Sequence, residues 1–373
     1  MAAPEVARED VQEYYGKTLN CTKDLKTNVC TIAGRPKMIK SVRQALAAVH
    51  DDVKASFYGC GLTIPPHIEG CRILDLGSGS GQDCFAISKL VGANGSVVGV
   101  DMTDKQLDIA YKHEEYHREL FGYKEKNTRF VKGYIEDLKA AKLKDDEFDI
   151  VVSNCVVNLS PDKRAVLQEA YRVLKPGGEL YFSDIYTENE LPDAVRNDKV
   201  LWGECLAGAL PWKDLISFSK QCGFTTPRLV STAPVDISDE QAAAVLGELK
   251  FVSATYRMFK LNPSPSDGSK VTYQGTLSEY EAELPFDSEL TFKAGVSVEV
   301  DADLSSILQN TRYASIFQVS PGSSDATVVK CPTDPFIGLP KQLDSAEGQK
   351  KATNGCCSQP SPACKPAAKS CCS

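Results

Sequence analysis

Short apolar runs, rich in valine and isoleucine, alternate with longer amphipathic stretches between residues 72 and 185. Nearly continuous apolar runs are typical of parallel strands that helices cover on both faces, because neither face of such a strand meets water. We therefore expect five buried strands in this part of the chain. They are predicted at residues 72–76, 96–101, 128–132, 148–153 and 179–183.

The segments between these runs carry helix signals. Thr103 and Gln106 have the spacing of a capping box before a helix that reaches about residue 120. Proline is favoured in the first turn of a helix, so Ser160-Pro161 predicts the start of another helix, which the segment 175–178 ends. Strands that alternate with helices in this way predict a doubly wound, parallel α/β sheet.

The chain after the fifth strand is expected to complete the sheet and then form a smaller unit. Two strands, at 226–231 and 251–261, flank a predicted helix near 239–249, and Asp214 and Gly223 mark the ends of the helix before them. A linker rich in proline and serine follows. The predicted organisation is an N-terminal extension or lid at 1–65, a cofactor-binding sheet at 66–185, a region completing the sheet at 186–262, a small α+β domain at 270–340 and a disordered tail at 345–373.

Composition is that of a globular protein with more than one domain: 373 residues, 42% hydrophobic and 25% charged. The net charge of −8 argues against a general nucleic-acid binder. No apolar run is long enough to cross a membrane, and the N-terminus lacks the basic start of a signal peptide. We therefore expect a cytoplasmic protein without membrane contact, whose 14 cysteines stay reduced.

A glycine-rich loop follows the first predicted strand. Residues 75–81 read Asp-Leu-Gly-Ser-Gly-Ser-Gly, and glycines let a backbone turn tightly and approach a ligand closely. A dinucleotide fingerprint needs another glycine where Gln82 stands. The loop instead resembles motif I of class I methyltransferases, which use S-adenosylmethionine. Asp101, at the end of the second strand, is placed to accept hydrogen bonds from ribose hydroxyls.

This resemblance implies cofactor-binding residues after each of the first four strands. Tyr134 stands where many relatives of this broad class carry an acid. The implied cofactor-binding residues are Asp75, Gly77, Ser78, Gly79, Gly81, Asp101, Met102, Gln106, Ile135, Glu136 and Asn154.

Cysteines lie where a methyltransferase of this class holds its substrate. Cys155 follows the fourth strand at the carboxyl edge of the sheet, where ligands bind in open α/β folds. Cys205 lies in an irregular insertion that holds both tryptophans of the chain. Thiolates select soft acceptors, so a methyl donor aimed at them suggests a thiophilic metalloid substrate. Free cysteines are also often small buried hydrophobes, the interpretation we favour for Cys71, Cys84 and Cys222.

Several motifs together resemble the arsenite methyltransferase family. The likeness extends from about residue 10 to 340 and includes Trp202-Gly203-Glu204-Cys205. Its other motifs are at residues 14–16, 24–30, 58–61, 75–83 and 153–158.

The resemblance implies roles for four thiols. Those of Cys155 and Cys205 would hold trivalent arsenic, and those of Cys30 and Cys60 would take part in arsenic binding and in a disulfide relay. Either Cys60 or Cys30 would be the third arsenic ligand. Two further residues, Tyr58 and Glu204, would lie next to the metalloid.

The implied reaction transfers methyl groups from S-adenosylmethionine to thiol-bound arsenic. It gives methylarsenite and dimethylarsenite, a detoxification chemistry. Each methylation oxidises the arsenic, so the implied partners include thioredoxin or glutathione as reductant. We expect a monomer.

Three alternatives compete with this interpretation. His113-Glu114-Glu115-Tyr116-His117 matches the H-E-x-x-H motif of zinc proteases, although its helix carries a charged face and no third ligand is evident. The substrate of the methyltransferase could instead be a sterol, a quinone or an amine. A protein that is not an enzyme could buffer metals through the paired cysteines of its tail, Cys356-Cys357, Cys364 and Cys371-Cys372.

Overall fold

A mixed sheet forms the centre of the protein, with the strand order β3-β2-β1-β4-β5-β8-β7 and β6 paired to the end of β5. The computed structural model describes residues 4–18, 38–237, 239–261, 268–322 and 332–337. Strands β1 to β5 are parallel, and β8 runs antiparallel to β5 and β7. The predicted doubly wound sheet is confirmed. Its strands are β1 Arg72–Leu76, β2 Ser96–Asp101, β3 Thr128–Lys132, β4 Phe148–Asn154, β5 Leu174–Thr187, β6 Leu210–Pro211, β7 Arg228–Pro234 and β8 Phe251–Phe259.

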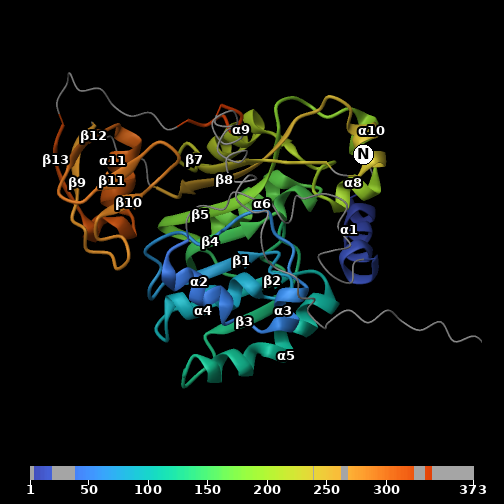
Figure 1. Cartoon of the computed structure of the whole chain (residues 1–373), viewed down its shortest axis with the longest axis horizontal. Helices are drawn as coiled ribbons and strands as arrows, with labels where there is room; N and C mark the ends of the chain where they lie inside the picture. Colours follow the sequence, from blue (N-terminus) through green and yellow to red (C-terminus); the bar gives the residue numbers. More distant parts are fainter. Residues whose placement is uncertain (1–3, 19–37, 238, 262–267, 323–331, 338–373) are drawn as a thin grey trace, which may run out of the picture.

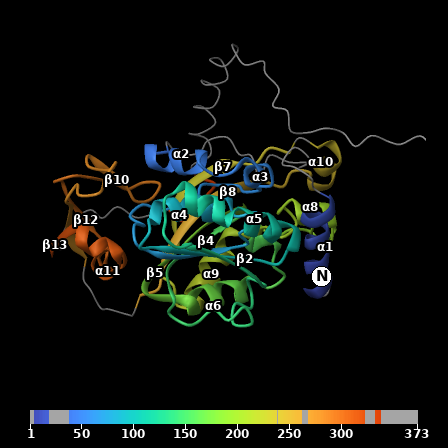
Figure 2. The same cartoon turned by 90° about the horizontal axis from the view of Figure 1, so that it is seen from below.

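Helices cover both faces of this sheet (Figures 1 and 2). Helices α2 and α4 lie over one face, and α6 and α9 lie over the other (Figure 2). None of the described helices is long and apolar enough to cross a membrane. The helices around the sheet are α1 Pro4–Glu13, η1 Tyr14–Thr18, α2 Lys40–Ala47, α3 Asp51–Ala55, α4 Gln82–Val91, α5 Asp104–Leu120, η4 Val157–Leu159, α6 Lys163–Val173, α7 Asp193–Arg196, α8 Lys199–Gly203, α9 Trp212–Cys222 and α10 Glu240–Leu246.

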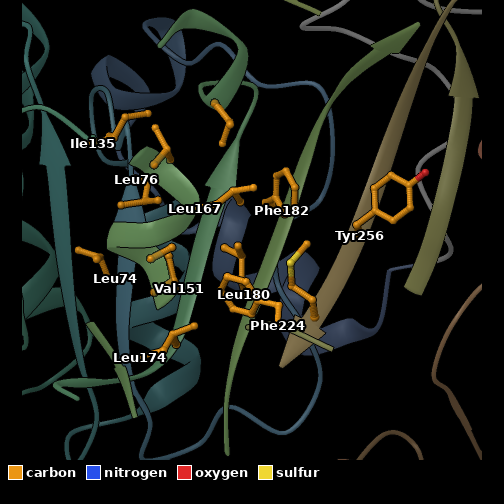
Figure 3. Close-up of a cluster of buried hydrophobic side chains, with 14 of the residues drawn as sticks. Leu74, Leu76, Ile135, Val151, Leu167, Leu174, Leu180, Phe182, Phe224 and Tyr256 are labelled. Atoms are coloured by element: carbon orange, nitrogen blue, oxygen red, sulfur yellow. The ribbon is translucent and has the colours of Figure 1, made fainter. Parts of the chain in front are cut away.

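Successive residues of the central strands belong to two separate apolar clusters, one on each face of the sheet. Leu74 and Val151 pack with Phe182 on the side of α6 and α9, and Figure 3 shows this cluster. Their chain neighbours Ile73 and Ile150 pack against α4 on the opposite face. Burying one such side chain stabilises the fold by about 1.5–3 kcal/mol. Both faces of the central strands β1, β2 and β4 are buried, so these strands are largely apolar rather than alternating.

The starts of α6 and α9 differ from the sequence prediction, because their N-caps are Asp162 and Pro211 rather than the predicted residues. Helix α10 ends at Leu246, three residues before the predicted end. Helix α6 begins at Lys163 rather than at Pro161, since the Asp162 carboxylate accepts a hydrogen bond from the Ala165 backbone N–H at 3.0 Å. It ends at Val173, and the segment 175–178 belongs to β5. Helix α9 begins two residues before Asp214, with Pro211 at its N-cap. Gly223 ends it in a left-handed conformation, as predicted.

A small α+β domain follows, as predicted, and lies at the opposite end of the molecule from α1 (Figure 1). It has a three-stranded sheet of order β12-β9-β13 and a β10-β11 ribbon. Its elements are β9 Ser269–Tyr273, β10 Glu283–Pro285, β11 Thr291–Lys293, β12 Ser297–Val300, α11 Ala302–Asn310, η5 Arg312–Ile316 and β13 Phe317–Pro321.

Buried charges join this domain to the central sheet. Glu179 of β5 is fully buried and lies between Arg257 Nη2 of β8 at 2.6 Å and Arg312 Nη2 of η5 at 2.5 Å. Arg257 also donates to the Tyr313 hydroxyl at 2.7 Å. Removing one of these charged side chains would leave a buried charge without its partner, which is unfavourable. The Glu179–Arg312 ion pair therefore stabilises the contact between the small domain and the central sheet.

Candidate active site

The glycine loop turns between β1 and α4 through three left-handed residues. Gly77, Gly79 and Gly81 have φ of +69°, +51° and +90°. A Cβ on Gly77 would collide with the side chain of Val156, and one on Gly81 would lie 2.7 Å from the Phe130 ring. Glycine is therefore required by conformation and by space. A Cβ on Gly79 would meet nothing closer than 3.8 Å, so this part of the loop is open.

The carboxylate of Asp101 organises this loop from the end of β2. Its oxygens accept hydrogen bonds from the backbone N–H groups of Gly79 and Thr103, each at 2.8 Å. Burial raises the pKa of Asp101. Thr103 is the N-cap residue of α5, as expected, but its side chain makes no capping hydrogen bond to the helix. The predicted capping box is therefore wrong in its contacts.

A cavity of about 910 Å³, counting its open mouth, begins at this loop. Ser78 Oγ and Gln106 Oε1 line it, are buried, and have no hydrogen-bond partner within the described part of the chain. Buried polar atoms normally find a partner, so these two suit a polar ligand. All the predicted cofactor-binding residues except Gly81 line this cavity: Asp75, Gly77, Ser78, Gly79, Asp101, Met102, Gln106, Ile135, Glu136 and Asn154. Gly81 lies at the N-cap of α4, where the loop ends.

Acidic side chains outnumber basic ones in the lining of this cavity. Four carboxyl residues reach it, against one arginine among the described residues. Burial, and then repulsion from Asp83, raises the pKa of Asp75 well above its usual range. A cationic ligand would relieve this repulsion and favour the ionised carboxylates. S-adenosylmethionine carries a sulfonium and an ammonium group, so the lining fits its charge.

The N-terminal helix closes one side of the cavity. Arg8 of α1 pairs with Glu136 at 2.6 Å, and its guanidinium lies 4.4 Å from the centre of the Tyr134 ring. Gln12 Nε2 donates to the Met102 backbone carbonyl at 3.0 Å. The segment after β3 thus meets a second element of the chain, a contact that the local sequence did not reveal.

Cys155 and Cys205 share a rare backbone conformation. Each has a φ of +62°, which is strained for a residue with a side chain. Cys155 follows β4 directly, since that strand extends to Asn154, and it lines the cavity. Cys205 is fully buried, and its Sγ donates to the Cys155 backbone carbonyl at 3.2 Å. The fold therefore brings the two predicted arsenic ligands together from positions 50 residues apart.

Cys60 belongs to the same apolar cluster as Cys155 and Cys205. Its backbone N–H donates to Asn154 Oδ1 at 2.9 Å, and its Sγ lies 3.5 Å from Ser183 Oγ. The other predicted relay residue, Cys30, lies outside the described residues, as do the tail cysteines.

Glu204 and Tyr58 also lie in this part of the protein. Glu204 is buried beside Cys205, and the Tyr14 hydroxyl donates to its Oε1 at 2.5 Å. Tyr15 packs edge to face on Tyr58, with ring centres 5.4 Å apart, and both line the cavity. The segment η1 therefore touches the thiol side of the cavity while α1 touches the cofactor side.

A lysine lies near the thiol pair and carries an unusual pKa. Lys163 Nζ donates to the Ser160 carbonyl at 3.0 Å and lies 5.2 Å from the Trp202 ring. Burial lowers its pKa to about 8, while the nearby Asp184 and Cys205 act in the opposite direction. Nothing in the local sequence distinguishes Lys163 from a surface lysine of α6.

The remaining described cysteines have the properties of structural residues. Cys84 is fully buried and donates to Asp75 Oδ2 at 3.2 Å. Burial raises the pKa of Cys71, Cys84 and Cys222, which disfavours their thiolates.

The H-E-x-x-H sequence does not build a zinc site. The His117 ring is stacked on Phe85 at 3.8 Å, and its Nε2 accepts a hydrogen bond from the His50 backbone N–H at 3.2 Å. His113, His50 and Asp52 place ligand atoms within 4.8 Å of one another. The Lys112 ammonium, however, already lies 2.9 Å from an Asp52 oxygen.

Comparisons with known proteins agree with this geometry. Residues 67–225 match a family model described as a methyltransferase domain, and residues 266–364 match the arsenite methyltransferase C-terminal domain. The human arsenite methyltransferase is 48% identical over 362 residues, covering 94% of this chain and 96% of the human protein. The arsenite methyltransferase of Aquipseudomonas alcaligenes is 49% identical over 314 residues, covering 83% of this chain and 90% of that protein. A crystal structure of an arsenic(III) S-adenosylmethionine methyltransferase from Chlamydomonas reinhardtii is 42% identical, with a TM-score of 0.73 over 80% of this chain and 100% of that one. The chain belongs to the arsenite methyltransferase family.

Proposed function

We propose that this protein transfers methyl groups from S-adenosylmethionine to trivalent arsenic held by Cys155 and Cys205. One observation carries the proposal. A single cavity extends from the Gly77–Gly81 turn to Cys155, whose carbonyl accepts a hydrogen bond from the Cys205 thiol. Close family members across nearly the whole chain support the same activity.

The cofactor half of the site is proposed to act through backbone and carboxylate groups. Asp101 would accept hydrogen bonds from the ribose, and Ser78 and Gln106 would supply the polar contacts for which their buried atoms have no partner in the described chain. Asp75 would balance positive charge. S-adenosylmethionine, when bound, supplies the electrophilic methyl carbon that the arsenic lone pair attacks.

The arsenic half is proposed to act mainly by orientation. Thiolates of Cys155 and Cys205 would pin the arsenic and leave its lone pair facing the cofactor. Such positioning can lower a barrier by roughly 7–11 kcal/mol. The strained φ of +62° at both cysteines aims their side chains in fixed directions. A lone pair carries no proton, so the methyl transfer itself needs no general base.

The redox half of the cycle is proposed to use Cys60 and Cys30. Methyl transfer forms an arsenic–carbon bond and leaves arsenic formally pentavalent. Two thiolates would then lose two electrons and form a disulfide, and arsenic would regain its lone pair. An external thiol, thioredoxin or glutathione, would reduce that disulfide by exchange.

The direct test is incubation of the purified protein with S-adenosylmethionine, arsenite and a thiol, with the arsenic species separated afterwards. Cys155→Ser and Cys205→Ser should abolish methylation of arsenite and of methylarsenite. Cys60→Ser should impair the first methylation more than the second. Cys71→Ser and Cys222→Ser are matched controls and should retain activity. No methylated arsenic with the unaltered protein would refute the proposal.

A second measurement separates this activity from the alternatives. Bound arsenite should protect Cys155 and Cys205 from alkylation, which a sterol, quinone or amine methyltransferase would not show. A metal buffer that works through its tail should lose metal binding when residues after Ser345 are removed. The proposed enzyme should keep its methylation in that truncation.

A further inference from the structure

One asparagine side chain holds the loop that carries Cys60. Asn154 Oδ1 accepts hydrogen bonds from the backbone N–H groups of Cys60 at 2.9 Å and Gly61 at 3.2 Å. Its Nδ2 donates to the Gly61 carbonyl at 3.1 Å and to Asp83 Oδ2 at 2.9 Å. A carboxamide has two acceptor and two donor positions, so these four bonds use all of them.

Steric contacts leave this loop little freedom. A Cβ on Gly59 would lie 2.7 Å from Asn154 Nδ2, and a Cβ on Gly61 would collide with Ser183. The two glycines that flank Cys60 therefore let the loop lie directly against Asn154 and β5. Larger residues at either position would push the loop away from the carboxamide.

Serine side chains complete the cage around Cys60. Ser253 Oγ donates to the Cys60 carbonyl at 3.1 Å, and the Cys60 Sγ lies 3.5 Å from Ser183 Oγ. The backbone N–H, the carbonyl and the thiol of this residue are thus all in contact, and its residual exposure is 5%.

The position of Asn154 connects three parts of the site. It is the last residue of β4 and precedes Cys155 directly. Its partner Asp83 lies in the first turn of α4, immediately after the glycine loop. The same side chain therefore links the Cys60 loop to the strand that precedes Cys155 and to the helix after the cofactor loop.

We propose that Asn154 is the positioning residue for Cys60, fixing its thiol beside the Cys155–Cys205 pair, in addition to lining the cofactor cavity. The hydrogen bonds described above are enough to infer that Asn154 holds the Cys60 loop in place. Its consequence for arsenic chemistry rests on the proposed function, since only there does the thiol of Cys60 take part in the reaction.

Alkylation of Cys60 by iodoacetamide, followed site by site with mass spectrometry, tests the holding without any methylation assay. Half-buried Cys71 serves as the reference thiol in the same molecule. Asn154→Ala removes three hydrogen bonds to the loop backbone, so Cys60 should react about ten- to thirtyfold faster relative to Cys71. Asn154→Asp keeps the volume and places an anion against Asp83, and it should also speed alkylation.

A double variant that exchanges the carboxylate and the carboxamide between positions 154 and 83 tests whether the bond between them can be restored. Combining Asn154→Asp with Asp83→Asn exchanges donor and acceptor in the bond between these side chains and removes the repulsion. Alkylation of Cys60 should slow again relative to the single Asn154→Asp variant. A double variant as reactive as the single one would contradict the proposed link.

Asn127 offers a matched control for general loss of structure. Its carboxamide makes three hydrogen bonds: Nδ2 donates to the Ser88 carbonyl at 3.1 Å and the Gly92 carbonyl at 3.0 Å, and Oδ1 accepts from Ser88 Oγ at 2.6 Å. It precedes β3, at the edge of the sheet away from the thiols. Asn127→Ala should leave the Cys60 alkylation ratio unchanged.

Kinetics distinguish positioning from cofactor binding. Asn154→Ala should lower kcat for arsenite methylation while the Kd for S-adenosylmethionine stays within about twofold. A raised Kd with an unchanged Cys60 alkylation ratio in both Asn154 variants would overturn the proposal. If the unaltered protein methylates no arsenic, the proposed function fails, and the alkylation ratio still decides whether Asn154 holds Cys60.

Discussion

The acid stability of this protein should depend on His117. The ring is 1% exposed, its Nδ1 lies 2.7 Å from the His113 carbonyl, and its Nε2 lies 3.2 Å from the His50 backbone N–H. Nδ1 must donate to the carbonyl and Nε2 must accept from the N–H, so the folded protein requires the neutral ring. Burial lowers the pKa of His117 from 6.5 to about 4.

The sign of the effect follows from which state binds the proton. The unfolded chain takes up a proton near pH 6.5, whereas the folded chain resists it until about pH 4. Stability is therefore fully present above pH 6.5 and is lost as the pH falls through that window. Linkage gives a loss of about 2 kcal/mol between pH 7 and pH 5.

Urea unfolding of the unaltered protein and of His117→Gln at pH 7, 6 and 5 measures this loss. Glutamine can still accept from the His50 N–H but does not titrate, and carboxylates common to both proteins cancel in the difference. The stability advantage of the unaltered protein should shrink by about 2 kcal/mol between pH 7 and pH 5. A difference that stays constant over this range would refute the assignment of a neutral, buried ring.

Three further predictions concern the cofactor loop, the domain contact and the N-terminal helix. Gly77→Ala strains the turn and pushes on Val156, so the Kd for S-adenosylmethionine, measured by calorimetry, should rise about tenfold or more; an unchanged Kd would contradict the loop's role. Glu179→Gln leaves two buried arginines without a counter-charge and should lower the free energy of unfolding by about 3–5 kcal/mol, whereas a loss below about 1 kcal/mol would speak against the buried contact. Arg8→Ala removes the ion pair with Glu136 and should raise the KM for S-adenosylmethionine several-fold with little change in kcat; an unaffected KM would show that α1 does not support that subsite.

The central sheet could be predicted because its signals are local. Apolar runs identified β1 and β2 at their observed bounds, since strands buried on both faces contain few polar residues. The edge strand β3 also has its predicted bounds, although Arg129 and Lys132 are exposed. The start of α6 was predicted two residues early because Pro161 and Asp162 both suit a helix N-terminus, and only the structure shows which one caps it. The left-handed Gly223 was recognisable because glycine is the usual residue in that conformation.

The site could be predicted only in part, because its decisive features are tertiary. The four cysteines were recognised through family motifs, but cysteine gives no local sign of the φ of +62° at Cys155 and Cys205. Asn154 was expected to bind the cofactor, and its hydrogen bonds to a loop 93 and 94 residues away are not visible in the sequence. The contact of Arg8 with Glu136 spans 128 residues and was missed for the same reason.

X-ray absorption at the arsenic edge tests the central claim most directly, since it reports which atoms surround the bound arsenic. In the full-length protein with arsenite, the account predicts arsenic surrounded by sulfur. Cys155→Ser and Cys205→Ser should each remove one sulfur neighbour, while Cys71→Ser should remove none. Arsenic that keeps the same sulfur neighbours in both site variants would contradict the claim that these two thiols hold the substrate.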